Sequence, residues 1–140
     1  MVNKKYVAFL MEIIRETKQK KITWEYLDKN KRLYEGMNWT HVDTQYGFFV
    51  NKETVSPDFN SEESFCSKVN NYNLVIYVYK NQPPVFYIIP STFKSVVTLT
   101  SDEYGEYIVR LSNLVKSQFP NAETFIDEFL HENLHENNED

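Results

Sequence analysis

The stretch NLVIYVYKN, residues 73–81, constrains the fold more strongly than any other part of the chain. Successive side chains of an extended strand point to opposite faces. Both faces of this stretch are apolar, one through Leu74, Ile76 and Val78 and the other through Val75, Tyr77 and Tyr79. Because a strand with two apolar faces has to be covered on both sides, we predict that it is a central strand of a sheet.

Three further runs are rich in β-branched and aromatic residues, as strands are: QYGFFVNKE (45–53), ESFCSKVNN (63–71) and PVFYIIPS (84–91). Turn-forming residues lie between consecutive runs: Asn70-Asn71 between the runs at 63–71 and 73–81, and Asn81 to Pro84 between the runs at 73–81 and 84–91. Such short connections join antiparallel neighbours. The sequence therefore predicts an antiparallel sheet of about four strands.

A helix is predicted before the sheet. Apolar residues recur there at a helical spacing, namely Tyr6, Phe9, Leu10, Ile13, Ile14 and Thr17. Lysines and glutamates occupy the opposite face. This stripe is typical of a helix of about four turns that packs on a core. In the segment that follows, we expect Trp24 and Leu27 to fold back on this helix.

Two helices are predicted after the sheet. Thr100 and Glu103 form a capping-box pattern, followed by a helical stripe of Tyr104, Tyr107, Ile108, Leu111, Leu114 and Val115. Asn121 is suited to cap a last helix, whose apolar residues Phe125, Ile126, Phe129 and Leu130 we expect to face inward. Acidic residues crowd the end of this helix, so residues 134–140 should fray. The chain is thus expected to be one α+β domain, residues 1–140.

The compartment is indicated by the cysteine count and the start of the chain. Cys66 is alone, so no disulfide can form within the chain, which favours a reducing cytoplasm. Glu12 and Arg15 interrupt the apolar stretch near the start, and no small-residue cleavage site follows. No apolar run approaches the roughly 20 residues that span a bilayer. We therefore expect a cytoplasmic protein without a membrane partner.

Charge is distributed unevenly along the chain. Residues 1–34 carry a net charge of +5, residues 35–100 carry −2, and residues 101–140 carry −8. The basic start allows an alternative function in nucleic-acid binding, with phosphate contacts from Lys18, Lys20, Lys21, Lys29, Lys31 and Arg32. The overall pI of about 5.2 argues against a phosphate-binding protein.

The tail contains a metalloprotease-like motif. His131, Glu132 and His135 match HExxH, in which two histidines one turn apart bind zinc and the glutamate acts as general base. The helical wheel places both histidines away from the apolar face, and the only other histidine is the distant His41. We therefore predict that this motif binds no metal ion. The alternative is a small zinc hydrolase that uses these residues.

Other catalytic patterns are weak. Cys66 and His41 could in principle form a thiol–imidazole pair, but a cysteine in a strand is more often a small buried apolar residue. The chain has three isolated glycines and hence no glycine-rich phosphate loop. We predict no catalytic residue and no cofactor.

Tyrosines supply the candidate binding surface. Tyr is abundant in protein interfaces because its ring buries while its hydroxyl keeps a polar partner. The candidate partner-binding residues are Tyr72, Tyr77, Tyr79 and Tyr87, with the acidic C-terminal helices as a second surface. The alternatives are that these tyrosines cover the core beneath the helices, or that they stack on bases.

Two stretches carry a resemblance. The spacing of Leu10, Ile13-Ile14, Thr17, Ile22 and Trp24 and the sequence YIVRLSNLVKSQF…FIDEFL (107–130) resemble small uncharacterised proteins of low-GC Gram-positive bacteria and their phages or mobile elements. The resemblance implies an architecture and a genomic setting, but no catalytic residue. Accessory proteins in such settings are often inhibitors, immunity proteins or regulators. We therefore expect a non-catalytic domain that binds an unidentified protein partner or self-associates.

Overall fold

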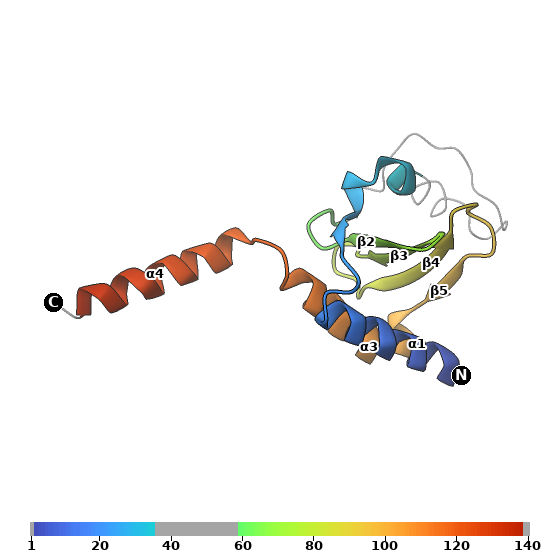
Figure 1. Ribbon diagram of the computed structural model, residues 1–140, viewed down its shortest axis with the longest axis horizontal. Coiled ribbons are helices and arrows are strands. Elements are labelled where there is room, and N and C mark those ends of the chain that lie inside the picture. Colours follow the sequence, from blue (N-terminus) through green and yellow to red (C-terminus); the bar gives the residue numbers. More distant parts are fainter. Residues whose placement is uncertain (1, 36–58, 139–140) are drawn as a thin grey trace.

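A computed structural model shows an α+β fold in which helices cover one face of a five-stranded sheet (Figure 1). It describes residues 2–35 and 59–138, the last five of these by backbone alone. The elements in chain order are α1 (Lys4–Lys18), β1 (Glu25–Tyr26), the short 3-10 helix η1 (Leu27–Lys29), β2 (Phe65–Val69), β3 (Tyr72–Tyr77), β4 (Val85–Pro90), β5 (Val97–Leu99), α3 (Ser101–Lys116) and α4 (Ala122–Asn138). The predicted fold class is confirmed.

The sheet is an antiparallel meander in the order β1-β2-β3-β4-β5. β3 lies at its centre, as its two apolar faces predicted. The predicted turns are also present: Asn70 and Asn81 have φ angles of 57° and 61°, in the left-handed region that Asn tolerates. The predicted strand at 45–53 lies outside the described residues, whereas β1 and β5 were not predicted.

The strand register places two apolar rows back to back. Ile76 of β3 pairs with Phe65 of β2 and Phe86 of β4, and all three belong to the core beneath the helices. The next row, Val75 with Cys66 and Tyr87, belongs to a second core on the opposite face. Each row alternates with the other because neighbouring strand residues point to opposite faces.

The first core lies between the sheet and the pair α1 and α3, which run side by side (Figure 1). Two hydrogen bonds hold the ends of these helices together. The Asn3 backbone N–H donates to the Tyr104 hydroxyl over 2.9 Å, and the Gln118 side chain donates to the Thr17 carbonyl over 3.2 Å. The stripe predicted for α1 is confirmed, since Leu10, Ile13, Ile14 and Thr17 are buried.

The second core lies between the other face of the sheet and residues 27–35 (Figure 1). Leu27 and Leu33 are buried there with Tyr77. The prediction for Leu27 was therefore wrong, because the chain crosses the edge of the sheet at β1 and places Leu27 on the far side from α1. Trp24 does pack toward α1, and its ring N–H donates to the Thr17 hydroxyl over 3.1 Å.

The start of α3 differs from the predicted capping box. The helix begins after Thr100 as expected, but the Thr100 side chain makes no capping hydrogen bond. Tyr104 has non-helical angles, φ −124° and ψ 19°, so the first turn is offset from the rest of the helix. The neighbouring Ser101 hydroxyl donates instead to the Pro84 carbonyl and fixes this end of the helix to β4.

The packing of α3 gives a first prediction. Leu111 is fully buried against α1 and the sheet, whereas Val109 on the same helix is 40% exposed. We expect Leu111→Ala to lower the free energy of unfolding by about 2–5 kcal/mol, through lost burial and the cavity it leaves. Val109→Ala should change it by less than about 0.5 kcal/mol. Urea denaturation measures both, and equal losses would contradict the described packing of α3.

Candidate functional site

The candidate site is α4, which extends away from the sheet and from the other helices (Figure 1). Every side chain from Ala122 to Glu132 is exposed. Four large apolar side chains are among them: Phe125 is 64% exposed, Ile126 48%, Phe129 53% and Leu130 50%. The helix itself was predicted. The prediction that its apolar side faces inward was wrong, because no core of the domain lies against that side.

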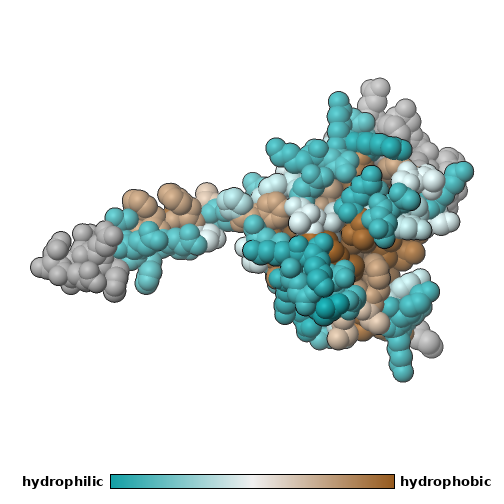
Figure 2. Space-filling model, in the orientation of Figure 1, coloured by the Kyte–Doolittle hydropathy of each residue, from teal (hydrophilic) through white to brown (hydrophobic). Residues whose placement is uncertain are grey.

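The apolar residues of α4 share one side of the helix, and polar residues occupy the other (Figure 2). At about 100° per residue, the four span roughly 140° of the helical wheel. The Phe125 and Phe129 rings lie one turn apart with centroids 5.8 Å from each other. Glu123 and Asp127 follow one edge of this face, and Glu128 and Glu132 the other. The result is an apolar stripe with carboxylates along both edges.

The junction between α3 and α4 is anchored to the body of the domain. The Phe119 ring lies 4.9 Å, centroid to centroid, from both Tyr26 and Phe65. Only Pro120 separates this anchor from Asn121, whose side-chain oxygen accepts from the Glu123 N–H over 2.8 Å. The predicted Asn121 cap is thereby confirmed. Proline fixes its own φ, so the link between the anchor and the cap has fewer free backbone angles.

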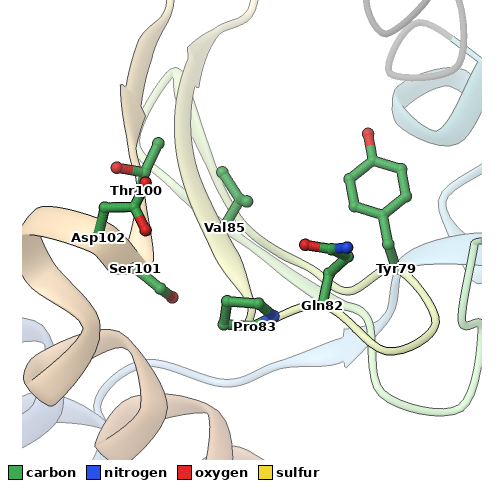
Figure 3. Close-up of a pocket in the computed structure, with 7 residues that line it drawn as sticks. All are labelled: Tyr79, Gln82, Pro83, Val85, Thr100, Ser101 and Asp102. Atoms are coloured by element: carbon green, nitrogen blue, oxygen red, sulfur yellow. The ribbon is translucent and has the colours of Figure 1, made fainter.

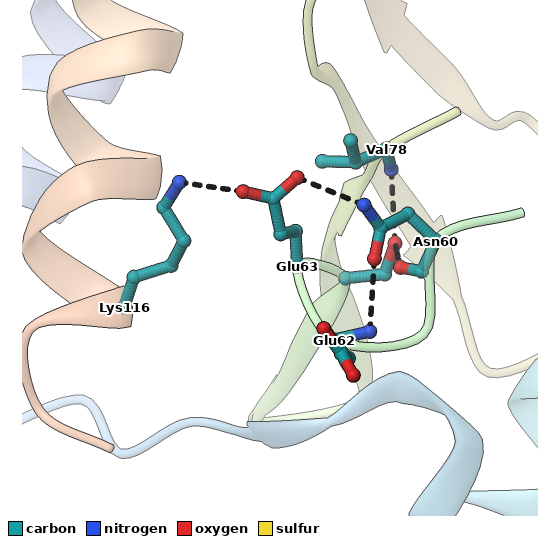
Figure 4. Close-up of polar contacts among 6 residues, drawn as sticks. Asn60, Glu62, Glu63, Val78 and Lys116 are labelled. Carbon is teal, nitrogen blue, oxygen red and sulfur yellow. Dashed lines mark hydrogen bonds and ion pairs between the residues drawn. The ribbon is translucent and has the colours of Figure 1, made fainter. Parts of the chain in front are cut away.

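An ion pair supports the same junction (Figure 4). Lys116, at the end of α3, lies 2.9 Å from a Glu63 carboxylate oxygen, and the other oxygen accepts from the Asn60 side chain over 2.9 Å. A cavity of about 510 Å³ opens here, and Glu63, Lys116 and Phe119 help to line it. These contacts join α3 to the loop before β2, so they stabilise the base of α4.

The four candidate tyrosines do not form one exposed surface. Tyr77 and Tyr87 are 0% and 6% exposed within the second core, and Tyr79 is half-buried beside them. Tyr72 is 50% exposed, but it lies at the start of β3, on the face opposite to Tyr77. The predicted tyrosine face is therefore corrected: three of its members contribute to packing, because the segment 27–35 and Phe59 cover that side of the sheet.

Burial changes the pKa values of side chains in this second core. It raises the pKa values of the Tyr77, Tyr79 and Tyr87 phenols. Burial, together with the nearby Glu25 carboxylate 3.7 Å away, raises the pKa of the Cys66 thiol to about 12. A thiol with so high a pKa carries almost no thiolate near neutral pH and is a poor nucleophile. Its candidate partner His41 lies outside the described residues.

The six basic candidates lie in two separate groups. Lys18 is the last residue of α1, on one side of the sheet, and Lys20 and Lys21 follow it. Lys29, Lys31 and Arg32 belong to the segment 27–35, which covers the other face (Figure 1). All six are exposed. The Arg32 guanidinium lies 5.9 Å from the centre of the Phe93 ring, where it packs against the domain. The fold thus separates these cations and does not align them along one groove.

The HExxH residues lie at the outer part of α4. His131 and Glu132 are exposed, and the side chain of His135 lies outside the described residues, as does His41. Within residues 2–35 and 59–133, no group of three or more His, Cys, Asp or Glu side chains could hold a metal ion. The described part of the motif therefore carries no third ligand.

One further cavity lies beside the start of α3 (Figure 3). Its volume is about 370 Å³, and the β3–β4 turn and the first residues of α3 line it. The lining residues include Tyr79, Gln82 and Asp102. Asp102 is the one carboxylate of this lining, and it has no histidine, cysteine or lysine beside it there. This arrangement lacks the paired groups that general acid–base or nucleophilic catalysis requires.

No family model, no curated protein and no solved structure matches the chain. As for membranes, none of the helices in the described ranges combines the length and the apolarity needed to cross a bilayer.

The buried thiol and phenols give a prediction for alkaline pH. The pKa values of Cys66 and Tyr77 are higher in the folded chain than their ordinary values of 9.0 and 10.0. The folded state therefore holds these protons more tightly than the unfolded state. The free energy of unfolding should fall as pH rises above about 9, and more steeply above about 10. Urea denaturation between pH 7 and pH 11 measures this, and Cys66→Ala should remove the loss that begins near pH 9.

The raised pKa of the Cys66 thiol also predicts a slow reaction with disulfide reagents. At pH 8, a pKa near 12 instead of 9.0 lowers the thiolate fraction of Cys66 on the order of 1,000-fold. We expect the disulfide reagent 5,5′-dithiobis(2-nitrobenzoate) to react at least about 30-fold more slowly with the folded protein than with protein unfolded in guanidinium, since higher nucleophilicity offsets part of the lost thiolate. Equal rates in the two states would contradict the burial of Cys66.

Proposed function

We propose that this protein is a non-catalytic binding domain of the inhibitor, immunity or regulatory type, working in the cytoplasm, whose interaction element is α4. The observation that carries the proposal is the exposure of Phe125, Ile126, Phe129 and Leu130 along one side of that helix. Contiguous exposed apolar residues with polar edges are typical of protein interaction sites. The lone, buried Cys66 suits a reducing compartment.

The energetics of a projecting helix support a binding role. An isolated helix of 17 residues is marginally stable in water, because most helical stability in proteins comes from packing of the amphipathic face. α4 has such a face but no core of its own domain beneath it. A partner that buries this face would supply the missing packing, in the way that amphipathic helices dock into apolar grooves.

The anchored base makes α4 suitable as a recognition element. Phe119 and Asn121 fix where the helix starts, and Pro120 restricts the backbone between them. A helix with an anchored start loses less freedom on binding than one on a long, loose tether. The domain body, in this proposal, serves to hold the helix, and the buried tyrosines stabilise that body.

Site-specific photo-crosslinking in the cells that naturally carry the gene tests the proposal. With p-benzoylphenylalanine in place of Phe129, we expect a discrete crosslinked species, because this position lies in the exposed apolar face. The matched control carries the same group in place of His131, which is also exposed but lies on the polar side of the same turn. Crosslinking of equal strength at the two positions, or none at position 129, would refute the role of α4.

A further inference from the structure

We infer that α4 binds a second copy of this chain, by lying on the exposed face of α1, and that two copies exchange these helices reciprocally. This inference rests on the proposed function, because it names the protein that α4 contacts. Four observations carry it: the composition of the α1 surface, the match in spacing, the short anchored junction, and the area that the exchange would bury.

The outer face of α1 has the composition that complements α4. Lys4, Ala8, Met11, Arg15 and Lys18 are all exposed and fall within roughly 80° of the helical wheel. Met11 is 52% exposed, and with Ala8 it forms an apolar centre between cations. The long Lys and Arg stems can also cover apolar surface while their charged ends stay in water. Glu12 pairs with Arg15 beside this stripe, and such exposed pairs rearrange at little cost.

The charges favour the exposed face of α1, and not a second α4, as the surface that α4 binds. Residues 117–140 contain no Lys or Arg, and seven Asp or Glu. Two α4 helices packed face to face would bring carboxylates together along both edges of the contact. On α1, the same carboxylates would meet Lys4, Arg15 and Lys18. Opposite charges along the edges of an apolar contact favour this pairing over the α4–α4 pairing.

The spacing of charges and apolar groups agrees on the two helices. On α1, Lys4 and Arg15 lie about 16 Å apart along the axis, on either side of Ala8 and Met11. On α4, Glu123 and Glu132 lie about 14 Å apart and enclose the apolar residues. The apolar centre of one helix can therefore cover that of the other while the acids reach the cations at both ends.

The junction favours a second copy over the helix's own domain. Phe119 is packed against Tyr26 and Phe65, and Pro120 alone separates it from the Asn121 cap. From this junction α4 extends away from the domain and from its own α1 (Figure 1), so lying back on that helix would require a different backbone path through residues 117–121. The α1 face of another molecule can be reached without that change.

The buried area also favours a reciprocal exchange. The four apolar side chains of α4 expose on the order of 400 Å² together. One α4–α4 contact would bury about twice that, below the roughly 1,600 Å² of a standard interface. A reciprocal exchange has two contacts, each burying an α4 face and an α1 face, and approaches that size. It also has closed two-fold symmetry, so association stops at the dimer.

Sedimentation equilibrium of the purified full chain at about 10–200 µM tests the inference. We expect a dimer of twice the 16.7 kDa chain mass. Phe129→Asp on α4 and Met11→Asp on α1 should each raise the dimer dissociation constant at least about 30-fold. Tyr72→Ser is the matched control, because Tyr72 is as exposed as Met11 and Phe129 but belongs to β3 and to neither helix, and it should leave the constant unchanged.

Mixing the two defective variants separates the possible arrangements. The Met11→Asp copy has an intact α4 and the Phe129→Asp copy an intact α1 face, so their mixture should form a heterodimer with one sound contact, more stable than either variant alone. An α4–α4 dimer would be insensitive to Met11→Asp and would overturn the inference. A wild-type monomer at 200 µM would also overturn it. In that case, a crosslink from position 129 to a different protein would leave the proposed function standing.

Discussion

The structure depends on β3, a strand that contributes to two cores at once. Ile76 and its neighbours Phe65 and Phe86 pack beneath α1 and α3, while Val75, Cys66 and Tyr87 pack beneath residues 27–35. Neither covering layer could be removed without exposing one apolar row of the sheet to water. The helices α1 and α3 are in turn joined by the Asn3–Tyr104 and Gln118–Thr17 hydrogen bonds. The start of α4 is positioned by this arrangement, because Phe119 packs on the first core.

The elements that could be predicted from sequence are those that local periodicity determines. α1, β2, β3, β4 and α3 each carry their own pattern of apolar residues, and Asn70 and Asn81 mark the turns by their tolerance of positive φ. β5 has only three residues and depends on its pairing with β4, where Leu99 lies opposite Phe86. β1, with two residues, likewise depends on β2. Such strands are specified by their neighbours, so their own composition is a weak signal.

The face of the sheet on which each residue packs was harder to predict than the helices and strands themselves. Leu27 and Trp24 lie three residues apart, and both are apolar, yet β1 crosses the sheet edge between them and separates them into different cores. The tyrosines show the same difficulty. Tyr is compatible with a wet interface and with a buried site, and the sequence does not distinguish Tyr72 from Tyr77 until the cover over each face is known. For α4, periodicity identified the apolar face and Asn121 identified the start, but neither indicates what lies opposite that face.

The fold places many of the basic and acidic residues in different parts of the molecule. The basic residues of the first segment lie on the body of the domain, whereas five acidic residues of the last segment lie on α4, which extends away from it: Glu123, Asp127, Glu128, Glu132 and Glu136. Coulomb attraction between such exposed groups is weak in water and screened by salt, both within one molecule and between two. Charge therefore selects which surface α4 meets, and burial of its apolar face supplies most of the stability of that contact. An acidic, apolar helix that extends from the body of its domain is suited to select a basic surface with an apolar centre on another molecule.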